Sequence, residues 1–288
     1  MRQAMAVTVV VPTSLDAAVA VLAENPGAHL LAGGTDLMVE VNFGHRRPPA
    51  VVALRAVEEL RGWRRDGEQL VIGAGITWSQ LQEPDLASLA PGLAVAARTV
   101  GSPQIRNAGT LGGNIATASP AGDALPVLYA LDAVVDIVSA VGERSVPIAE
   151  LVTGVKRTSL AAGEIITAVR IPVAAGSQEF LKIGTRNAMV ISVASLALVV
   201  DSPRRAVACA LGACGPTIIR CADAEQHAAA EVDWTSGDVG GPAVEEFGRL
   251  AADAARPIDD QRSTARYRRH GVEVMARRAL MRAFPGAL

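Results

Sequence analysis

Two glycine pairs in the sequence have the composition of anion-binding turns. The first lies within residues 30–37, LLAGGTDL, where an apolar run meets the glycines and a helical pattern follows. The second lies within residues 109–114, GTLGGN. At such turns main-chain N–H groups can point at an anion, the helix dipole assists, and glycine allows a close approach. Two sets of amides in one chain predict a pyrophosphate site, because a pyrophosphate carries charge on two linked groups.

A plainer interpretation is that each glycine pair only completes a tight turn. A hydroxyl residue beside each pair, Thr35 and Thr110, favours the anion site. Neither segment matches GxxxxGK[ST] or GxGxxG, so a P-loop or a Rossmann dinucleotide site is not supported.

Lys182 is a second candidate for chemistry. Only Lys156 and Lys182 are lysines, and the other basic residues are arginines. A lysine retained at the end of an expected strand favours a role for its compact ammonium group. The alternative is an ordinary surface charge.

Composition excludes several classes of protein. The chain has 288 residues, 50% of them hydrophobic and 19% charged, which predicts a folded protein of two domains, or one elaborate domain, rather than a disordered one. The formal net charge of −2 argues against a nucleic-acid partner bound through phosphate neutralisation. The longest apolar stretch, 193–200, is too short for an integral membrane segment, and no secretion signal is evident. We therefore expect a cytoplasmic protein.

Cysteine and histidine do not suggest a metal centre or a catalytic residue. The three cysteines, Cys209, Cys214 and Cys221, lack CxxC spacing and are too few to hold an iron–sulfur cluster alone. We expect buried, idle thiols. The four histidines are expected to be structural or exposed.

Hydrophobic periodicity predicts the elements that position these residues. Residues 101–123 are expected to form a long, nearly uncharged, functional loop, and a domain boundary is expected near 173–178. Helices are expected over 15–22, 37–41, 77–81, 124–131, 244–255 and 264–284. Strands are expected over 29–32, 51–54, 70–75, 134–138, 165–171, 179–185, 191–201 and 206–213.

Three motifs in this order resemble one family. They are LLAGGTDL at 30–37, QIRNAGTLGGNIATASPAGD at 104–123 and EFLKIGTRNA at 179–188. Together they resemble the FAD-binding medium subunit of the molybdenum hydroxylases, the family of xanthine dehydrogenase, carbon monoxide dehydrogenase and related aldehyde dehydrogenases. The resemblance covers essentially the whole chain.

The resemblance implies an α+β fold of two domains. Residues 1–173 would form a two-subdomain FAD-binding domain of the vanillyl-alcohol-oxidase type, split near residue 57. Residues 178–288 would form a C-terminal flavoprotein domain, a small three-stranded sheet followed by helices. FAD would lie between the two domains, with its pyrophosphate on the glycine-rich segments.

The resemblance also implies the site residues. Asp123 falls where the family places an FAD-binding carboxylate, Ile166 where it places an apolar residue near the flavin, and Lys182 on a basic position at the flavin. A positive charge there would favour the anionic reduced ring. The cofactor-binding residues implied are Leu30, Leu31, Ala32, Gly33, Gly34, Thr35, Asp36, Leu37, Val100, Ser102, Thr110, Leu111, Gly112, Gly113, Asn114, Asp123, Ile166 and Lys182.

The function implied is electron transfer without a catalytic residue or metal on this chain. A large partner subunit would carry the molybdenum cofactor on molybdopterin and oxidise the organic substrate. A small partner would carry two [2Fe–2S] clusters and pass electrons to FAD, which would reduce NAD, a quinone or oxygen. The complex would be a dimer of heterotrimers. Two alternatives are a self-sufficient FAD-dependent oxidase and a non-enzymatic assembly or nucleotide-binding protein with a degenerate site.

Overall fold

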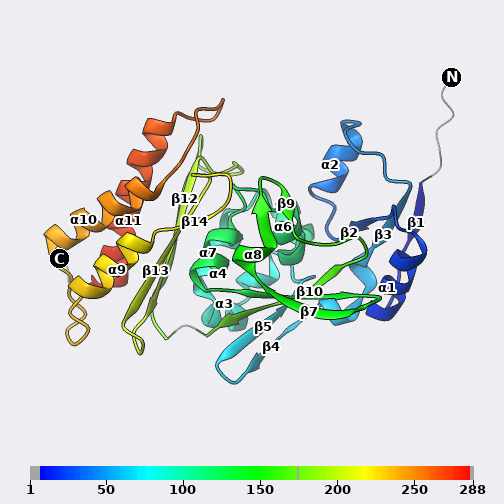
Figure 1. Cartoon of the computed structure of the whole chain (residues 1–288), viewed down its shortest axis with the longest axis horizontal. Helices are drawn as coiled ribbons and strands as arrows, with labels where there is room; N and C mark the ends of the chain where they lie inside the picture. Colours follow the sequence, from blue (N-terminus) through cyan, green and yellow to red (C-terminus); the bar gives the residue numbers. More distant parts are fainter. Residues whose placement is uncertain (1–6, 174, 286–288) are drawn as a thin grey trace.

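The computed structural model describes residues 7–173 and 175–285. Ala174, which belongs to the expected linker, and the N-terminal residues 1–6 lie outside these ranges. Sheets of three, five and four strands follow one another along the long axis of the molecule, and the C-terminal helices lie at the far end (Figure 1). The cofactor site predicted from the glycine pairs must therefore be sought between these layers.

The three-stranded sheet is parallel, and a helix lies in each connection between its successive strands, as parallel pairing requires a long crossover. Its strands are ordered β1-β3-β2. Helix α1 begins where the Ser14 hydroxyl accepts the amide of Ala17, and it packs Ala18 and Leu22 toward Val52. The elements are β1 (Thr8–Val10), α1 (Leu15–Glu24), β2 (His29–Leu31), α2 (Leu37–Asn42) and β3 (Ala50–Ala53).

The five-stranded sheet is antiparallel, in the order β4-β5-β10-β6-β7. Its central strand β10 pairs with β5 on one side and β6 on the other. The edge strands β4 and β7 are mostly exposed and polar, so hydrophobic periodicity did not predict them. The strands are β4 (Trp63–Asp66), β5 (Gln69–Gly73), β6 (Val134–Ser139), β7 (Gly142–Pro147) and β10 (Ile165–Pro172).

Short helices fill the space around this sheet. The prediction of a structureless loop over 101–123 is wrong in part, because Ser102 and Thr110 cap two helices there with their side-chain oxygens. The helix expected over 77–81 is only a 3₁₀ turn, Gln80–Gln82. The helices are α3 (Pro84–Leu89), α4 (Pro91–Thr99), α5 (Pro103–Ala108), α6 (Leu111–Thr117), α7 (Ala124–Ala130) and α8 (Ile148–Leu151), and a hairpin joins β8 (Val152–Gly154) to β9 (Arg157–Thr158).

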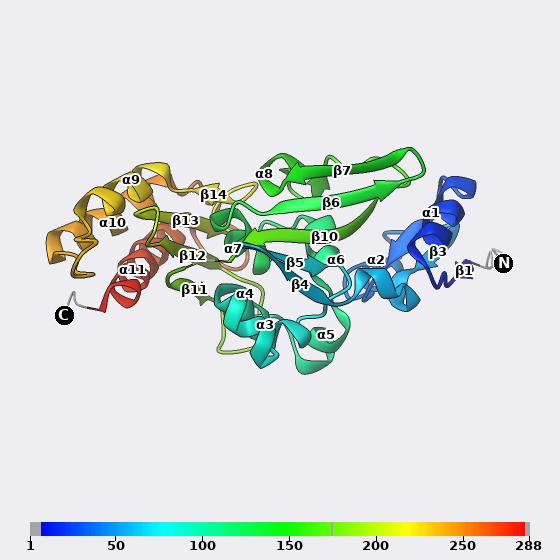
Figure 2. The ribbon, with the colours of Figure 1, turned by 90° about the horizontal axis from the view of Figure 1, so that it is seen from below.

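The C-terminal sheet is covered on both faces. Helices α4 and α7 pack on its inner side, and α9 and α11 pack on its outer side (Figure 2). Strand β12 is buried along nearly its whole length, which explains its continuous apolar sequence. The strands are β11 (Gln178–Ile183), β12 (Ala194–Asp201), β13 (Ala206–Gly212) and β14 (Ile219–Arg220), and the helices are α9 (Ala222–Glu231), α10 (Gly241–Ala254) and α11 (Ala265–Ala283).

Three details of this region differ from the sequence-based expectation. The predicted strands are shorter, so residues 184–193 form a loop between β11 and β12. A two-residue strand, β14, adds a fourth member to the expected three. Helix α9 was not predicted, because its run of alanine and acidic residues has no pronounced apolar face.

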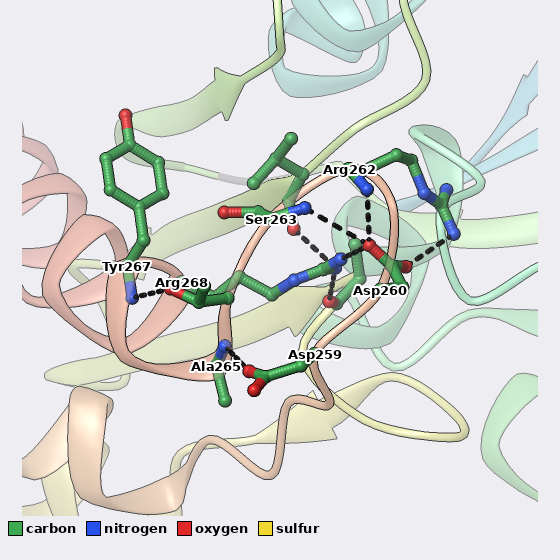
Figure 3. Close-up of polar contacts among 10 residues, drawn as sticks. Asp259, Asp260, Arg262, Ser263, Ala265, Tyr267 and Arg268 are labelled. Atoms are coloured by element: carbon green, nitrogen blue, oxygen red, sulfur yellow. Dashed lines mark hydrogen bonds and ion pairs between the residues drawn. The ribbon is translucent and has the colours of Figure 1, made fainter.

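A buried arginine fixes the end of that loop. Arg268 on α11 donates to the carbonyl oxygens of Val193 and Ala213, both at 2.9 Å, and pairs with Asp260 at 2.5 Å. Figure 3 shows Asp260 also accepting the amides of Arg262 and Ser263. The ion pair and the two carbonyl acceptors compensate for burial of the charge, although the Arg268 Nε has no hydrogen-bond partner among the described residues. The network ties loop, sheet and helix together.

Candidate functional site

A cleft of about 1050 Å³ lies between the three-stranded sheet and one end of the five-stranded sheet, where β10 begins. Both glycine segments line it, and Ile191 of the C-terminal domain lines it as well. Its volume is at the upper end of the ~300–1,000 Å³ range of small-molecule sites, which suits a ligand as long as a dinucleotide.

The two glycine segments touch each other at this cleft. A Cβ atom on Gly33 would lie 1.8 Å from the carbonyl oxygen of Ala108, which no side chain could tolerate. A Cβ on Gly112 would lie 2.6 Å from the Cβ of Ala74. Gly34 adopts a positive φ of 73°, the region that favours glycine. The glycines therefore allow close backbone packing, and they place residues 33–36 directly against 108–113.

The first segment has free main-chain donors. Across the described residues, no acceptor faces the amides of Gly33, Gly34, Thr35 or Asp36. Four consecutive amides without a protein partner are unusual beside a cleft, because main-chain donors are nearly always bonded. This segment fits the predicted anion cradle.

The second segment does not offer a second set of amides, which corrects the expectation from sequence. The amides of Leu111 and Gly112 donate to the carbonyls of Ile76 and Ala74 at 2.9 Å each. The amide of Gly113 donates to the Thr110 hydroxyl at 3.1 Å. These three amides are already hydrogen-bonded, to residues up to 38 positions earlier in the chain. The spacing of the glycines in the sequence could not show that they are unavailable to a ligand.

Asn114 gives the second segment a different role. Its side-chain oxygen Oδ1 is buried and lacks a hydrogen-bond partner among the described residues, although the residue lines the cleft. An unpartnered buried acceptor costs free energy unless a ligand or water supplies a donor. Together with the four free amides, this orphaned oxygen fits a bound dinucleotide cofactor.

Most of the predicted site residues meet in the cleft, and four do not. Ser102 instead caps α5, and Leu111 is completely buried in the core. Asp123 and Lys182 do not line the cleft and are paired with each other. The predicted residues that line the cleft are Leu30, Leu31, Ala32, Gly33, Gly34, Thr35, Asp36, Leu37, Val100, Thr110, Gly112, Gly113, Asn114 and Ile166.

The Asp123–Lys182 pair joins the two halves of the chain. The Lys182 Nζ lies 2.6 Å from Asp123 Oδ2 and donates to the carbonyl of Thr99. Asp123 also accepts the hydroxyl of Ser192 at 2.6 Å. Burial raises the pKa of Asp123, and the Lys182 ammonium opposes that rise. The pair links the segment after α6 to both ends of the 184–193 loop, whereas the resemblance placed both residues on the flavin.

Sequence reasoning missed several residues of the cleft. Lys156, at the tip of the β8–β9 hairpin, reaches across to Asp36 and Glu40. The only indication of Lys156 in the sequence was that lysine is rare in this chain. Trp78 lines the cleft while almost entirely buried, and His29, expected to be structural or exposed, lines it too.

The remaining chemistry-bearing residues lie away from the cleft. Cys209, Cys214 and Cys221 are buried free thiols, and burial raises the pKa of Cys214 to about 12, so it stays protonated. Within the described ranges no group of acidic, histidine and cysteine side chains has the arrangement of a metal site. Nor is any helix of the described chain long and apolar enough to cross a membrane.

Comparison with known proteins agrees with this site. Residues 5–174 match the model of the FAD binding domain in molybdopterin dehydrogenase, and residues 179–283 match the CO dehydrogenase flavoprotein C-terminal domain. The chain belongs to this family of FAD-binding dehydrogenase subunits.

Individual relatives of the chain show which type of subunit it is. The putative xanthine dehydrogenase FAD-binding subunit XdhB of Escherichia coli K12 is 32% identical over 280 residues, 94% of this chain and 93% of that one. Quinoline 2-oxidoreductase of Pseudomonas putida 86 matches with a TM-score of 0.88 at 27% identity, covering 98% of each chain. Carbon monoxide dehydrogenase of Hydrogenophaga pseudoflava matches at 0.86 and 28%, also covering 98% of each. This chain is an FAD-binding medium subunit of the molybdenum hydroxylase type, and hence an oxidoreductase subunit.

Proposed function

We propose that this chain takes electrons from [2Fe–2S] clusters of a small partner and passes them to an acceptor such as NAD, a quinone or oxygen. A large molybdopterin-binding partner would oxidise the organic substrate, and the whole would be a dimer of heterotrimers in the cytoplasm. The support is the cleft together with the medium-subunit relationship. FAD supplies a ring that stores electrons and releases them to different acceptors.

The residues of the cleft divide the task of holding FAD. The free amides of Gly33 to Asp36 would donate to the pyrophosphate. Gly113 lies opposite, where a Cβ would be 3.0 Å from the Thr110 hydroxyl oxygen and 3.9 Å from the Cβ of Ala32. The Asn114 oxygen would accept a donor of the cofactor. Val100 and Ile166 add apolar wall.

The C-terminal domain would shape the end of the cleft where electrons are exchanged. Ile191 reaches that end, and its neighbour Ser192 is bonded to Asp123. The Asp123–Lys182 pair thereby holds the loop in place. Direct contact of Asp123 and Lys182 with the flavin stays a prediction, as do the contacts of Ser102 and Leu111.

The observation that carries the proposal is the run of four unpartnered amides at a contact only glycine allows. The test is a visible absorption spectrum of the complex purified with its partners, carrying Gly33→Ala in this chain. The variant should lose the flavin absorption and keep that of the iron–sulfur clusters, and substrate should still bleach the clusters while transfer to the acceptor stops.

Gly241→Ala is the matched control, because a Cβ at Gly241 meets nothing within 4 Å. That variant should keep both spectral components. Full flavin content in Gly33→Ala would contradict the proposed cradle. A wild-type protein with flavin but without partners, turning over substrate alone, would favour a self-sufficient oxidase, and a wild-type protein that takes up no FAD would indicate a degenerate site.

A further inference from the structure

Four charged side chains form a compact group at one side of the cleft. Lys156 Nζ lies 3.2 Å from Glu40 Oε1 and 3.5 Å from Asp36 Oδ1. Arg46 Nε lies 2.7 Å from Glu40 Oε2. All four residues line the cleft. The group therefore has two carboxylates and two cations, and its charges cancel.

This group adjoins the anion cradle directly. Asp36 contributes one of the four free amides, while its own carboxylate faces Lys156. A dianionic pyrophosphate bound at those amides would lie beside the carboxylates of Asp36 and Glu40. Like charges this close in the chain repel, although the Asp36 and Lys156 side chains are about half exposed and solvent weakens the repulsion. The acids must be neutralised for the cradle to hold its ligand.

The backbone holds Lys156 in position to do this. Its amide donates to the carbonyl of Ala118 at 3.0 Å, and its φ is +52° at the tip of the β8–β9 hairpin. The side chain then spans from the hairpin to α2, joining residues 116 positions apart. Hydrogen bonding from Lys156 is the main cause that lowers the pKa of Glu40, so the contact favours the charged carboxylate.

We infer that Lys156 is a determinant of FAD affinity, neutralising the Asp36 and Glu40 carboxylates beside the pyrophosphate cradle. The inference rests on the proposed FAD site. It assigns to the β8–β9 hairpin the neutralisation of these carboxylates, which neither glycine segment can provide. Arg46 pairs with Oε2 of Glu40, so Lys156 is the cation that neutralises Asp36.

The test is titration of the flavin-stripped full chain with FAD, following the change in flavin fluorescence. Lys156→Gln should raise the Kd by about tenfold, the size expected when one partner of a charge cluster is removed. Lys156→Arg should keep the Kd within about twofold of wild type because the charge remains. Arg157→Gln, on the exposed neighbour of Lys156, is the matched control and should also leave the Kd unchanged.

A second variant separates charge from structure. Asp36→Asn combined with Lys156→Gln leaves Glu40 paired with Arg46, so it should recover most of the lost affinity. Added salt should narrow the difference between Lys156→Gln and wild type, because salt screens the repulsion. A Kd for Lys156→Gln within about twofold of wild type, or no recovery in the double variant, would overturn the inference. Wild-type chain that takes up no FAD would overturn the proposed function as well.

Discussion

Lys182 Nζ and Asp123 Oδ2 lie 2.6 Å apart, and their side chains are only 9% and 6% exposed. Lys182 ends a strand of the C-terminal domain, whereas Asp123 precedes α7 of the FAD-binding domain. Two residues that the family resemblance places separately at the flavin are thus one ion pair across the domain boundary. Because Asp123 also accepts the hydroxyl of Ser192, the pair makes the cleft wall at Ile191 depend on the packing of both domains.

Removing the ammonium should destabilise the protein strongly. In Lys182→Met the Asp123 carboxyl stays buried without its cation, which costs about 3–5 kcal/mol in comparable cases. Burial raises the pKa of Asp123 further once Lys182 is gone, so the loss of stability should grow as pH rises and the carboxyl ionises. Denaturant unfolding at acid and neutral pH measures this.

The matched variant for that pair is Lys182→Met with Asp123→Asn. It removes both charges together and should recover much of the stability, because no buried charge remains. A Lys182→Met protein as stable as wild type at neutral pH would show that the pair contributes nothing to the domain contact.

Asn114 should matter for the cofactor more than for the fold. Its Oδ1 has no partner within the described chain, so Asn114→Ala should change the free energy of unfolding of the flavin-free protein by less than about 1 kcal/mol. The same variant should weaken FAD binding about fivefold, the worth of one hydrogen bond.

Asn107→Ala serves as the comparison for Asn114. Asn107 also lines the cleft, but its Oδ1 already accepts the Ser79 hydroxyl. FAD titration should therefore show a smaller change for Asn107→Ala. Equal Kd values for the two variants would mean that the Asn114 oxygen meets no donor of the cofactor.

We expect acid to weaken the attachment of α11, because protonation of Asp260 removes its ion pair with Arg268 of that helix. Burial favours a higher pKa for Asp260, but the amides of Arg262 and Ser263 and the Arg268 guanidinium together lower the pKa to about 2. A lowered pKa stabilises the fold above the unfolded value, 3.8, and this stabilisation is lost as pH falls toward 2.

Thermal unfolding across that pH window checks the contribution of Asp260. Asp260→Asn should lower stability at neutral pH by about 1–2 kcal/mol and flatten this part of the acid dependence. An unchanged acid profile in the variant would assign the acid sensitivity to other carboxylates.

Local patterns were enough to predict most of the framework. The apolar runs predicted strands β5, β6, β10 and β13, and helical periodicity predicted α1 and α11. Exposed strands such as Trp63–Asp66 and the short helices within 101–123 were missed, because their polar or glycine-rich sequences carry no hydrophobic period. Their formation depends on edge pairing and on caps.

The glycine pair was enough to predict a tight turn at Gly33 and Gly34, since only glycine supplies the close contact and the positive φ found there. Which amides remain free depends on how the chain packs in three dimensions. Those of Leu111 and Gly112 are taken by carbonyls of residues 76 and 74, whereas those of 33–36 face the cleft. The same packing brought Lys182 to Asp123 and Lys156 to Asp36. Whether a donor or a charge is available depends on what lies opposite in space, and that is set by chain packing rather than by neighbours in sequence.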